Sequence, residues 1–446
     1  MILHSTNGKS PKVSFAEGVA NGLAPDGGLY MPDELPKLPK AFFRNISEMS
    51  LTEIAFVVCD TLFGDVLSSS VIKKIVDDAI SFPVPLKRLE ANRYVLELFH
   101  GPTMSFKDLG ARFMAGLLAH LDPGGHLGRH IIVATGDDGG AAVADAFRAT
   151  PGSRVFVLYP AGELSETKIS RFSCLHNVKA IEVEGSFDDC QMLVKEVLRD
   201  AATGNARRLT SGNSINLARE LPSIIYFFHA YSCAVRAEGQ NARIVISVPC
   251  GNLGSLAAGL MAKKMGLPVS RFLAANNSND VFVEYLKTGG LKPRNALVTM
   301  ARAMDVGNPS NIARIIDLYN GDLQSLRNDV EGYAYTDEEI AETMRETLLR
   351  HAMPVSPQGA TALRAMNRHL APDETGVALM GAHPSKFAET FKAVTGVIPI
   401  PLPEDLPTRH GRIMHIPPTP GALSRILTMN EVNTTRKTSN KINVQL

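Results

Sequence analysis

Short apolar runs alternate with amphipathic segments through most of the chain. The runs at 131–135, 154–159 and 243–248 have the length of buried strands, and helix-like segments occur at 141–149 and 255–265. Two parallel strands need a crossover of a dozen or more residues between them, and this crossover is usually a helix. The alternation therefore predicts an α/β fold built on parallel sheets.

The same pattern divides the chain into four parts. Residues 1–95 are rich in turn-forming residues and contain one helix-like stretch at 72–80, so we expect an N-terminal domain there. We expect a smaller α/β domain at 96–235 and a larger one at 236–405. Beyond these, prolines recur and the last residues are polar without apolar periodicity. Residues 406–446 are therefore expected to form a loosely held or disordered tail.

Charge and composition narrow the range of partners. The 446 residues include 46 Lys and Arg against 45 Asp and Glu, a formal net charge of +1. The chain thus lacks the broad cationic field that nucleic acid or an anionic membrane would need. No apolar run approaches the ~20 residues that cross a bilayer, and the first residues lack a signal-peptide pattern, so we expect a cytoplasmic protein. The five cysteines are scattered without metal-ligand spacing, so neither a disulfide framework nor a metal site is expected.

Lys107 is the first residue with candidate chemistry. It lies in the segment ELFHGPTMSFKD, where Gly and Pro end a strand and a helix-like segment begins among apolar Met104, Phe106 and Leu109. Apolar surroundings favour the neutral amine of a lysine, which suits Schiff-base chemistry. From the local pattern alone, a solvated lysine at a helix start is the more common case.

A second candidate is the turn PCGNLGS at 249–255, between the strand at 243–248 and a helix-like segment. Glycines at such a turn let backbone N–H groups surround a phosphate while the helix dipole favours its charge. The turn lacks the Gly-Lys-Ser/Thr of a P-loop and the third glycine of a dinucleotide fingerprint. It suits a small phosphate such as that of pyridoxal phosphate, although a plain tight turn fits the same residues.

A third turn, ATGDDGG at 134–140, also stands between a strand and a helix-like segment. Its amides suit a carboxylate or a phosphate. Asp137 and Asp138 would repel that anion unless one points away or pairs with a substrate ammonium. An ordinary strand-to-helix turn is the alternative interpretation.

Blocks of residues along about the first 400 positions resemble the threonine synthase family. This family belongs to the fold-type II pyridoxal-phosphate enzymes, with tryptophan synthase β. The blocks follow family order: SFAEG from Ser14, GLAPDGGLY from Gly22, HGPTMSFKD from His100, EGSFDDC from Glu184, NSINLAR from Asn213, VPCGNLG from Val248, NSND from Asn277, AMD from Ala303, PSN from Pro309 and AHPSKF from Ala382. The resemblance implies two parallel-sheet α/β domains that flank the cofactor, together with an N-terminal domain.

The resemblance also implies roles for individual residues. Lys107 would hold pyridoxal 5′-phosphate as a Schiff base. The other cofactor-binding residues would be Gly251, Asn252, Leu253, Gly254 and Asp138. The substrate-binding residues would be Thr135, Asp137, Asn213, Ser214, Asn216 and Arg219. An arginine such as Arg219 suits a substrate phosphate because its fork binds oxyanions bidentately.

The reaction implied by the resemblance converts O-phospho-L-homoserine to L-threonine and phosphate. The α-proton and then a β-proton are removed, phosphate leaves from the γ-carbon, and water adds at the β-carbon. Lys107 would be the main acid and base, and the pyridoxal ring would be the electron sink.

The chain departs from the family pattern where substrate is expected to bind. The turn at 135–140 has TGDDGG where T-S-G-D-T-G is usual, so two hydroxyls are lost at Gly136 and Gly139 and an acid is gained at Asp137. In related enzymes this turn binds the substrate α-carboxylate. Further departures are Ala161 where lysine is common, Gln358 where histidine is common, and Gly381 where threonine is common, a position associated with the pyridine end of the cofactor.

Three functions therefore stay open. The first is threonine synthase, with a phosphorylated amino-acid substrate. The second is a divergent pyridoxal-phosphate lyase or γ-replacement enzyme of a specialised pathway, such as one that releases 2-oxobutyrate. The third is a non-catalytic relative that binds a ligand or partner, and the presence of Lys107 counts against it. We expect a monomer or homodimer without nucleic-acid or membrane partners.

Overall fold

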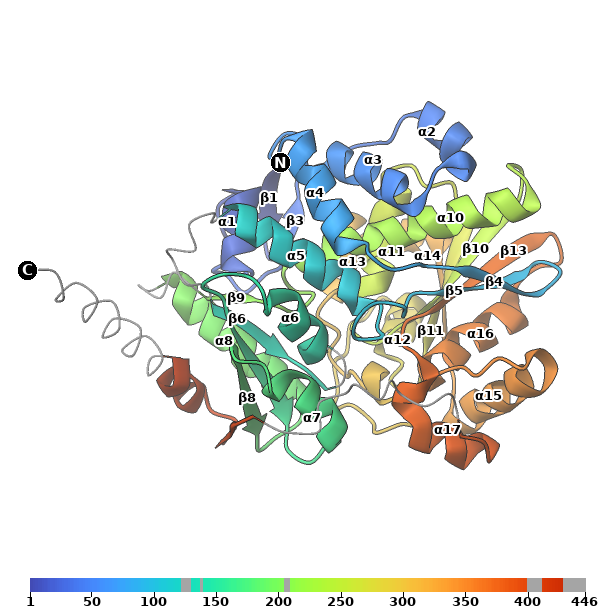
Figure 1. Cartoon of the computed structure of the whole chain (residues 1–446). Coiled ribbons are helices and arrows are strands. Elements are labelled where there is room, and N and C mark those ends of the chain that lie inside the picture. Colours follow the sequence, from blue (N-terminus) through green and yellow to red (C-terminus); the bar gives the residue numbers. More distant parts are fainter. Residues whose placement is uncertain (122–129, 137–138, 204–208, 399–410, 428–446) are drawn as a thin grey trace, which may run out of the picture.

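The computed structural model describes residues 1–121, 130–136, 139–203, 209–398 and 411–427. The chain forms two large sheets with helices on their faces, and an N-terminal region with a third, small sheet lies against both (Figure 1). The prediction of an α/β fold with parallel sheets is confirmed. Within the described ranges, no helix combines the length and the apolar character needed to span a membrane.

The larger sheet has six strands in the order β12 (Val330–Ala334), β11 (Arg271–Asn276), β10 (Arg243–Pro249), β13 (Glu374–Met380), β5 (Arg93–Glu97) and β4 (Leu86–Glu90). Its strands run parallel except β4, which is antiparallel to β5. Helices α10 (Ile224–Glu238) and α11 (Gly254–Lys264) pack on one face, and α15 (Asp337–His351) and α16 (Pro357–His369) lie on the other (Figure 1). The central strands are buried on both faces, which explains their continuous apolar runs.

The smaller sheet has five parallel strands in the order β14 (Ile413–Ile416), β8 (Val178–Val183), β7 (Arg154–Pro160), β6 (His130–Ala134) and β9 (Leu209–Ser211). Alternate residues of β6 face opposite sides, as the twofold period of a strand requires. Ile131 and Val133 pack with α6 (Gly139–Phe147), whereas Ile132 packs with α8 (Phe187–Thr203).

The N-terminal region contains the small antiparallel sheet β2 (Val13–Ser14), β1 (Ile2–Ser5) and β3 (Tyr30–Pro32). Its helices are α1 (Phe15–Asn21), α2 (Lys40–Asn45), α3 (Leu51–Phe63) and α4 (Ser69–Ala79). Helix α4 matches the expected stretch at 72–80, and it packs against α5 (Lys107–Leu121). The other helices are α7 (Glu166–Ser173), α9 (Leu217–Glu220), α12 (Val281–Thr288), α13 (Ile312–Leu318), α14 (Leu323–Asp329) and α17 (Ala388–Thr395).

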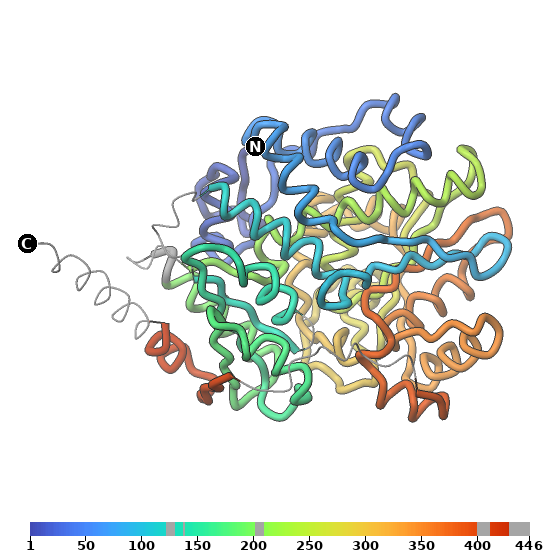
Figure 2. Tube along the Cα trace, viewed as in Figure 1, coloured from blue at the N-terminus to red at the C-terminus, as the bar shows by residue number. Residues whose placement is uncertain are grey.

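The expected boundary at residue 95 falls inside strand β5. This strand pairs with β13, and β4 extends the same sheet, so residues 86–97 belong to the larger sheet and not to an N-terminal domain (Figure 2). The sequence pattern reveals a strand here, but the partner of that strand is nearly 300 residues away. A boundary drawn from local patterns therefore divides a unit that hydrogen bonds hold together.

The expectation of a loose tail is wrong for residues 411–427. Strand β14 pairs with β8 at the edge of the smaller sheet, and Leu423 in the following helical segment is fully buried. At Gly411, the first residue of this described segment, the backbone lies so close to Ser173 that a Cβ would be 1.8 Å from the Ser173 carbonyl oxygen. The tail thus covers an otherwise open sheet edge with apolar side chains. Residues 406–410 and 428–446 of the expected tail lie outside the described residues.

Leu423→Ala tests whether this segment is part of the fold. Removal of a buried leucine side chain leaves a cavity, so we expect the free energy of unfolding to fall by about 2–5 kcal/mol. Chemical denaturation of the full-length chain measures this change. The matched control is Leu349→Ala, because Leu349 is 84% exposed and its truncation should change stability by only about 0.5 kcal/mol. Equal effects of the two substitutions would contradict the packing of 411–427.

Candidate active site

A cavity of about 780 Å³ lies at the carboxyl ends of strands from both sheets. Its lining includes residues that follow β5, β6, β10 and β13. In open parallel sheets, ligands characteristically bind at this edge. The cavity therefore lies where a ligand is expected to bind in a fold of this type.

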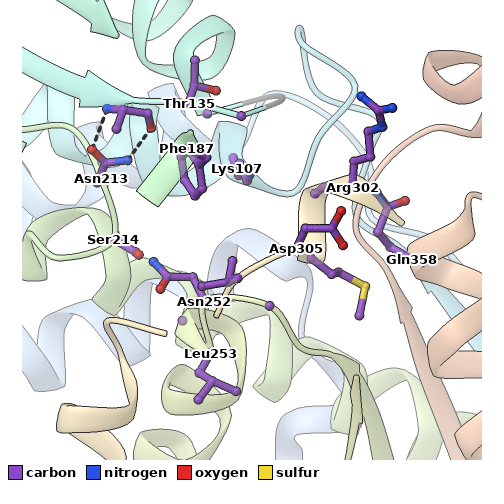
Figure 3. A pocket seen from close by; sticks show the side chains of 18 of the residues that line it. Lys107, Thr135, Phe187, Asn213, Ser214, Asn252, Leu253, Arg302, Asp305 and Gln358 are labelled. Carbon is purple, nitrogen blue, oxygen red and sulfur yellow. Dashed lines mark hydrogen bonds between the residues drawn. The ribbon is translucent and has the colours of Figure 1, made fainter. Parts of the chain in front are cut away.

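Most of the predicted site residues meet in this cavity, and several are shown in Figure 3. The lining contains Lys107, Thr135, Asn213, Ser214, Arg219, Gly251, Asn252, Leu253 and Gly254. Asn216 is not part of the lining. Its Nδ2 donates to the Val19 carbonyl and to Thr210 Oγ1, both at 3.0 Å, and its Oδ1 caps α9. Asp137 and Asp138 lie outside the described residues.

Lys107 begins helix α5 and is held in place by the end of β13. The backbone N–H of Phe106 donates to the Gly381 carbonyl at 2.8 Å, and Ser105 forms a β-bridge with Ala382. On the other side, the Asp108 carboxylate accepts bonds from the Thr103 N–H and hydroxyl. These contacts fix the backbone on both sides of the lysine, and its side chain lines the cavity (Figure 3).

The turn at 251–254 forms a cradle of backbone N–H groups at the start of α11. Leu253 adopts a left-handed conformation, with φ of 60°, and no side chain caps the helix there. The first N–H groups of a helix have no partner within it, so they are available to an anion. The space is tight around both glycines: a Cβ would lie 2.8 Å from Met304 Cα at Gly251 and 2.8 Å from Glu220 Oε2 at Gly254. This geometry suits a phosphate.

Asn252 and Ser214 line the cavity and also form hydrogen bonds with the loop that precedes α13. The Ser310 N–H donates to Asn252 Oδ1 at 2.6 Å. The Asn311 Nδ2 donates to the Asn252 carbonyl and to Ser214 Oγ, both at 2.9 Å. These bonds connect the cradle of the larger sheet with the 213–214 turn, which follows β9 of the smaller sheet.

The turn after β6 is held by Asn213. Its side-chain amide pairs with both backbone groups of Ala134, with distances of 2.9 and 2.7 Å (Figure 3). Both ends of this amide are therefore engaged with the main chain. At Gly136 a Cβ would lie 3.3 Å from the Phe187 ring, whereas at Gly139 it would make only ordinary contact with Thr135. The described part of this turn thus lines the cavity with Thr135 and with the backbone of the two glycines.

A buried cluster of charges forms one wall of the cavity. Arg219 and Glu220 are 7% and 4% exposed and both belong to the lining. A Cβ on Gly110 would lie 2.3 Å from Arg219 Nη1, so this guanidinium rests against helix α5. Burial raises the pKa of Glu220 to about 7, although Arg314 and Arg219 oppose the shift. Sequence reasoning identified Arg219 but missed Glu220 directly beside it.

Other polar residues of the lining were also missed. Arg302 is an exposed cation of the lining, and Glu163 lies within electrostatic reach of it. Burial raises the pKa of Glu163, and Arg302 opposes that rise. Asp305 is a structural anchor, since its carboxylate accepts bonds from Thr299 and Asn277. Asp305 belongs to the AMD block of the sequence, whereas Glu163 and Arg302 lie far along the chain from Lys107 and no local pattern marks them as site residues.

Glu220→Gln tests the buried charge through the pH dependence of stability. The pKa of Glu220 rises from 4.5 to about 7 on folding, so its stabilising contribution is present below pH 4.5 and is lost as the pH rises through about 7. Between pH 5 and pH 8 the wild type should lose roughly 2–3 kcal/mol of unfolding free energy relative to the variant. Denaturation at both pH values measures this difference. The exposed Glu346→Gln is the control, and an equal pH dependence in both variants would contradict the assignment.

Comparison with known proteins places this site in a family. Residues 82–380 match the family model described as pyridoxal-phosphate dependent enzyme, and residues 3–80 match threonine synthase N terminus. The chain is 37% identical to the threonine synthase of Escherichia coli over 96% of this chain and 100% of that one. It is also 37% identical to the threonine synthase of Haemophilus influenzae over 91% and 94% of the two chains.

Solved structures agree with the sequence comparison. The crystal structure of threonine synthase from Escherichia coli superposes with a TM-score of 0.89 at 36% identity, covering 97% of this chain and all of that one. The structure of pyridoxal-phosphate-bound threonine synthase from Brucella melitensis gives a TM-score of 0.85 at 30% identity, with 96% and 98% covered. The cavity with Lys107 and the 251–254 cradle is thus part of a fold that these proteins share along nearly their whole length. The chain belongs to the threonine synthase family of pyridoxal-phosphate-dependent enzymes.

Proposed function

We propose that this protein is a threonine synthase that converts O-phospho-L-homoserine to L-threonine and phosphate. One observation carries the proposal: Lys107 and the 251–254 cradle line the same cavity, although they follow different strands. Pyridoxal phosphate needs an amine for its aldehyde and an anion site for its phosphate, and this cavity offers both. The similarity to threonine synthases over nearly the whole chain supports the same conclusion.

The described residues fit the cofactor in two ways. Backbone N–H groups at the start of α11 suit the phosphate, and the tight space at Gly251 and Gly254 leaves no room for side chains in the cradle. Lys107 enters from the neighbouring part of the sheet edge and reaches the same cavity. When bound, the cofactor supplies an electron sink for carbanion chemistry at the substrate.

Lys107 has the position to move protons in this reaction. Once its amine no longer holds the cofactor, it can take the α-proton of the substrate and return protons at later steps. A role in amino-acid synthesis fits a cytoplasmic location.

Arg302 is more accessible to the phosphate of O-phospho-L-homoserine than Arg219 is. Arg219 is 7% exposed, and its guanidinium is packed between helix α5 and Glu220. Arg302 is exposed and belongs to the lining on the side of the larger sheet. We assign the substrate phosphate to Arg302, and we assign to Arg219 the neutralisation of nearby carboxylates.

The first test measures the products formed from O-phospho-L-homoserine in the presence of pyridoxal phosphate. Released phosphate, threonine and 2-oxobutyrate are quantified in the same samples, and we expect threonine to equal phosphate. Lys107→Ala should lower the rate by about 10³-fold or more, because no other group replaces its proton transfers. The exposed Lys74→Ala serves as the control. Phosphate matched by 2-oxobutyrate would instead identify a lyase, and no turnover by the cofactor-loaded wild type would reject the proposal.

The role of Arg302 is tested by Arg302→Leu and Arg302→Lys. A charge-assisted hydrogen bond contributes roughly 1.5–3 kcal/mol, so loss of the guanidinium should raise KM for O-phospho-L-homoserine about 10- to 100-fold. Lysine keeps the charge and should recover part of the affinity. Steady-state kinetics of both variants measure the effect. Unchanged KM values in Arg302→Leu would show that the phosphate binds elsewhere.

A further inference from the structure

Gln358 stands out in the cavity because its whole amide group lacks a partner. Its side chain is 6% exposed and belongs to the cavity lining. Neither Oε1 nor Nε2 has a hydrogen-bond partner among the described residues. An unsatisfied buried polar group costs roughly 1–3 kcal/mol. A native protein that keeps such a group in a binding cavity has a reason to do so, and a ligand is one such reason.

The backbone around Gln358 is fixed, so the amide cannot easily move to another partner. Gln358 is in the first turn of α16, which Ser356 caps through a bond from the Gly359 N–H. At Gly359 a Cβ would lie 2.6 Å from the sulfur of Met380, the last residue of β13. The helix therefore packs closely on the end of this strand, and Gln358 lies beside the 381–382 turn.

The Gln358 amide stays without a partner although polar groups belong to the same wall. Gly381 has no side chain, and a Cβ there would lie 3.1 Å from the Phe106 ring. Figure 3 shows the charged side chains of Arg302 and Asp305 on the same side of the cavity as Gln358, yet neither pairs with its amide. The Gln358 amide is thus a buried hydrogen-bonding group that no described side chain satisfies. Such a setting strengthens any bond that the amide makes to a bound ligand.

Strand order explains which part of the cofactor comes to this place. Strands β10, β13 and β5 are neighbours in the larger sheet. Their carboxyl-terminal turns carry the 251–254 cradle, Gly381 and the segment of Lys107, in that order. The cradle accounts for the phosphate of pyridoxal phosphate and Lys107 for its aldehyde. The ring then offers two further hydrogen-bonding sites. Its 3-oxygen is next to the aldehyde-bearing carbon and would therefore lie close to Lys107, whereas the ring nitrogen is opposite that carbon and would lie away from Lys107. The turn at Gly381 contributes no side chain of its own that could bind this nitrogen.

We infer that the Gln358 amide donates a hydrogen bond from Nε2 to the ring nitrogen of pyridoxal phosphate. This inference rests on the proposed function, since it requires the cofactor to be held by Lys107 and the cradle. This hydrogen bond would give Nε2 of the buried amide and the ring nitrogen a partner each. Gln358 acts here as a residue that tunes the cofactor and takes no part in proton transfer to the substrate.

A neutral amide has a specific consequence for the ring. A carboxylate partner would stabilise a proton on the nitrogen by charge attraction, whereas an amide N–H needs the nitrogen lone pair to be free. With Nε2 as the donor, the ring nitrogen is unprotonated; the reversed amide would instead place Oε1 as an acceptor for a protonated nitrogen, and the ¹⁵N shift separates the two arrangements. An unprotonated ring withdraws electron density less strongly than a protonated one. The surrounding residues must therefore stabilise more of the negative charge that develops on the substrate.

The experiment uses holoenzyme reconstituted with pyridoxal phosphate that carries ¹⁵N in the ring. For the wild type we expect the nitrogen chemical shift of an unprotonated, hydrogen-bonded pyridine. In Gln358→Glu the shift should move to that of a protonated pyridinium. In Gln358→Leu the nitrogen should stay unprotonated, lose the hydrogen-bond contribution to its shift, and bind the cofactor about tenfold more weakly. Thr361→Val on the same helix is the control, since Thr361 is buried and bonds only to the Pro357 carbonyl among the described residues.

The outcomes separate the inference from the proposed function. A wild-type protein that forms no yellow lysine-bound cofactor rejects the proposed function, and the inference falls with it. A wild type that binds the cofactor but shows a pyridinium nitrogen overturns the inference alone. The same holds if the shift and the affinity are equal in wild type and Gln358→Leu. Because the wild-type shift is informative by itself, a variant that fails to fold leaves the test decisive.

Discussion

The hydrogen-bonded register of β10, β13 and β5 is the constraint on which the site depends. Ser247 pairs with Ala378, and Ala378 pairs with Val95, so three strands from distant parts of the chain end at one edge. The segments that follow these strands all contribute residues to the cavity lining. Since successive side chains of a strand alternate in direction, a slip of one residue would exchange the side chains that β13 buries against the helices on its two faces. The parallel pairing thus fixes the distance between Lys107 and the cradle more than any contact within the cavity does.

The second constraint is the set of hydrogen bonds that joins the two sheets across the cavity. Arg314 of α13 is fully buried, and it donates to the carbonyls of Ser214 and Ile215 and to Asn311. Burial lowers its pKa to about 10, and Glu220 opposes that shift, so the guanidinium keeps its charge at neutral pH. A buried cation with several acceptors resists displacement, because any movement leaves a charge or a carbonyl unpaired. The turn at 213–214 is therefore rigidly placed against the cradle.

Local sequence patterns identified the parts of the site that a turn or a helix start marks. Lys107 at the start of α5 and the glycines at 251–254 both stand at such boundaries, and both line the cavity. The pattern could not show that Asn216 is a buried cap or that both ends of the Asn213 amide bind the main chain. The side chain of an asparagine near a site can bind either a ligand or the main chain, and only its hydrogen-bond partners in the structure show which. The pairing of β5 with β13 and of β14 with β8 lies beyond local patterns for the same reason.

The departures from the family pattern affect different parts of the cavity in different ways. At Gly139 there is ordinary space for a side chain, so the loss of a hydroxyl there removes a polar group and leaves the surrounding packing intact. At Gly381 the ring of Phe106 stands close, and the adjacent Gln358 brings an unpaired amide into the same wall. The two positions differ in kind, because Gly381 contributes no side chain and Gln358 contributes a buried amide. The departure at Gly381 therefore leaves the polar groups of this wall to the residues that pack beside it, of which Gln358 is one.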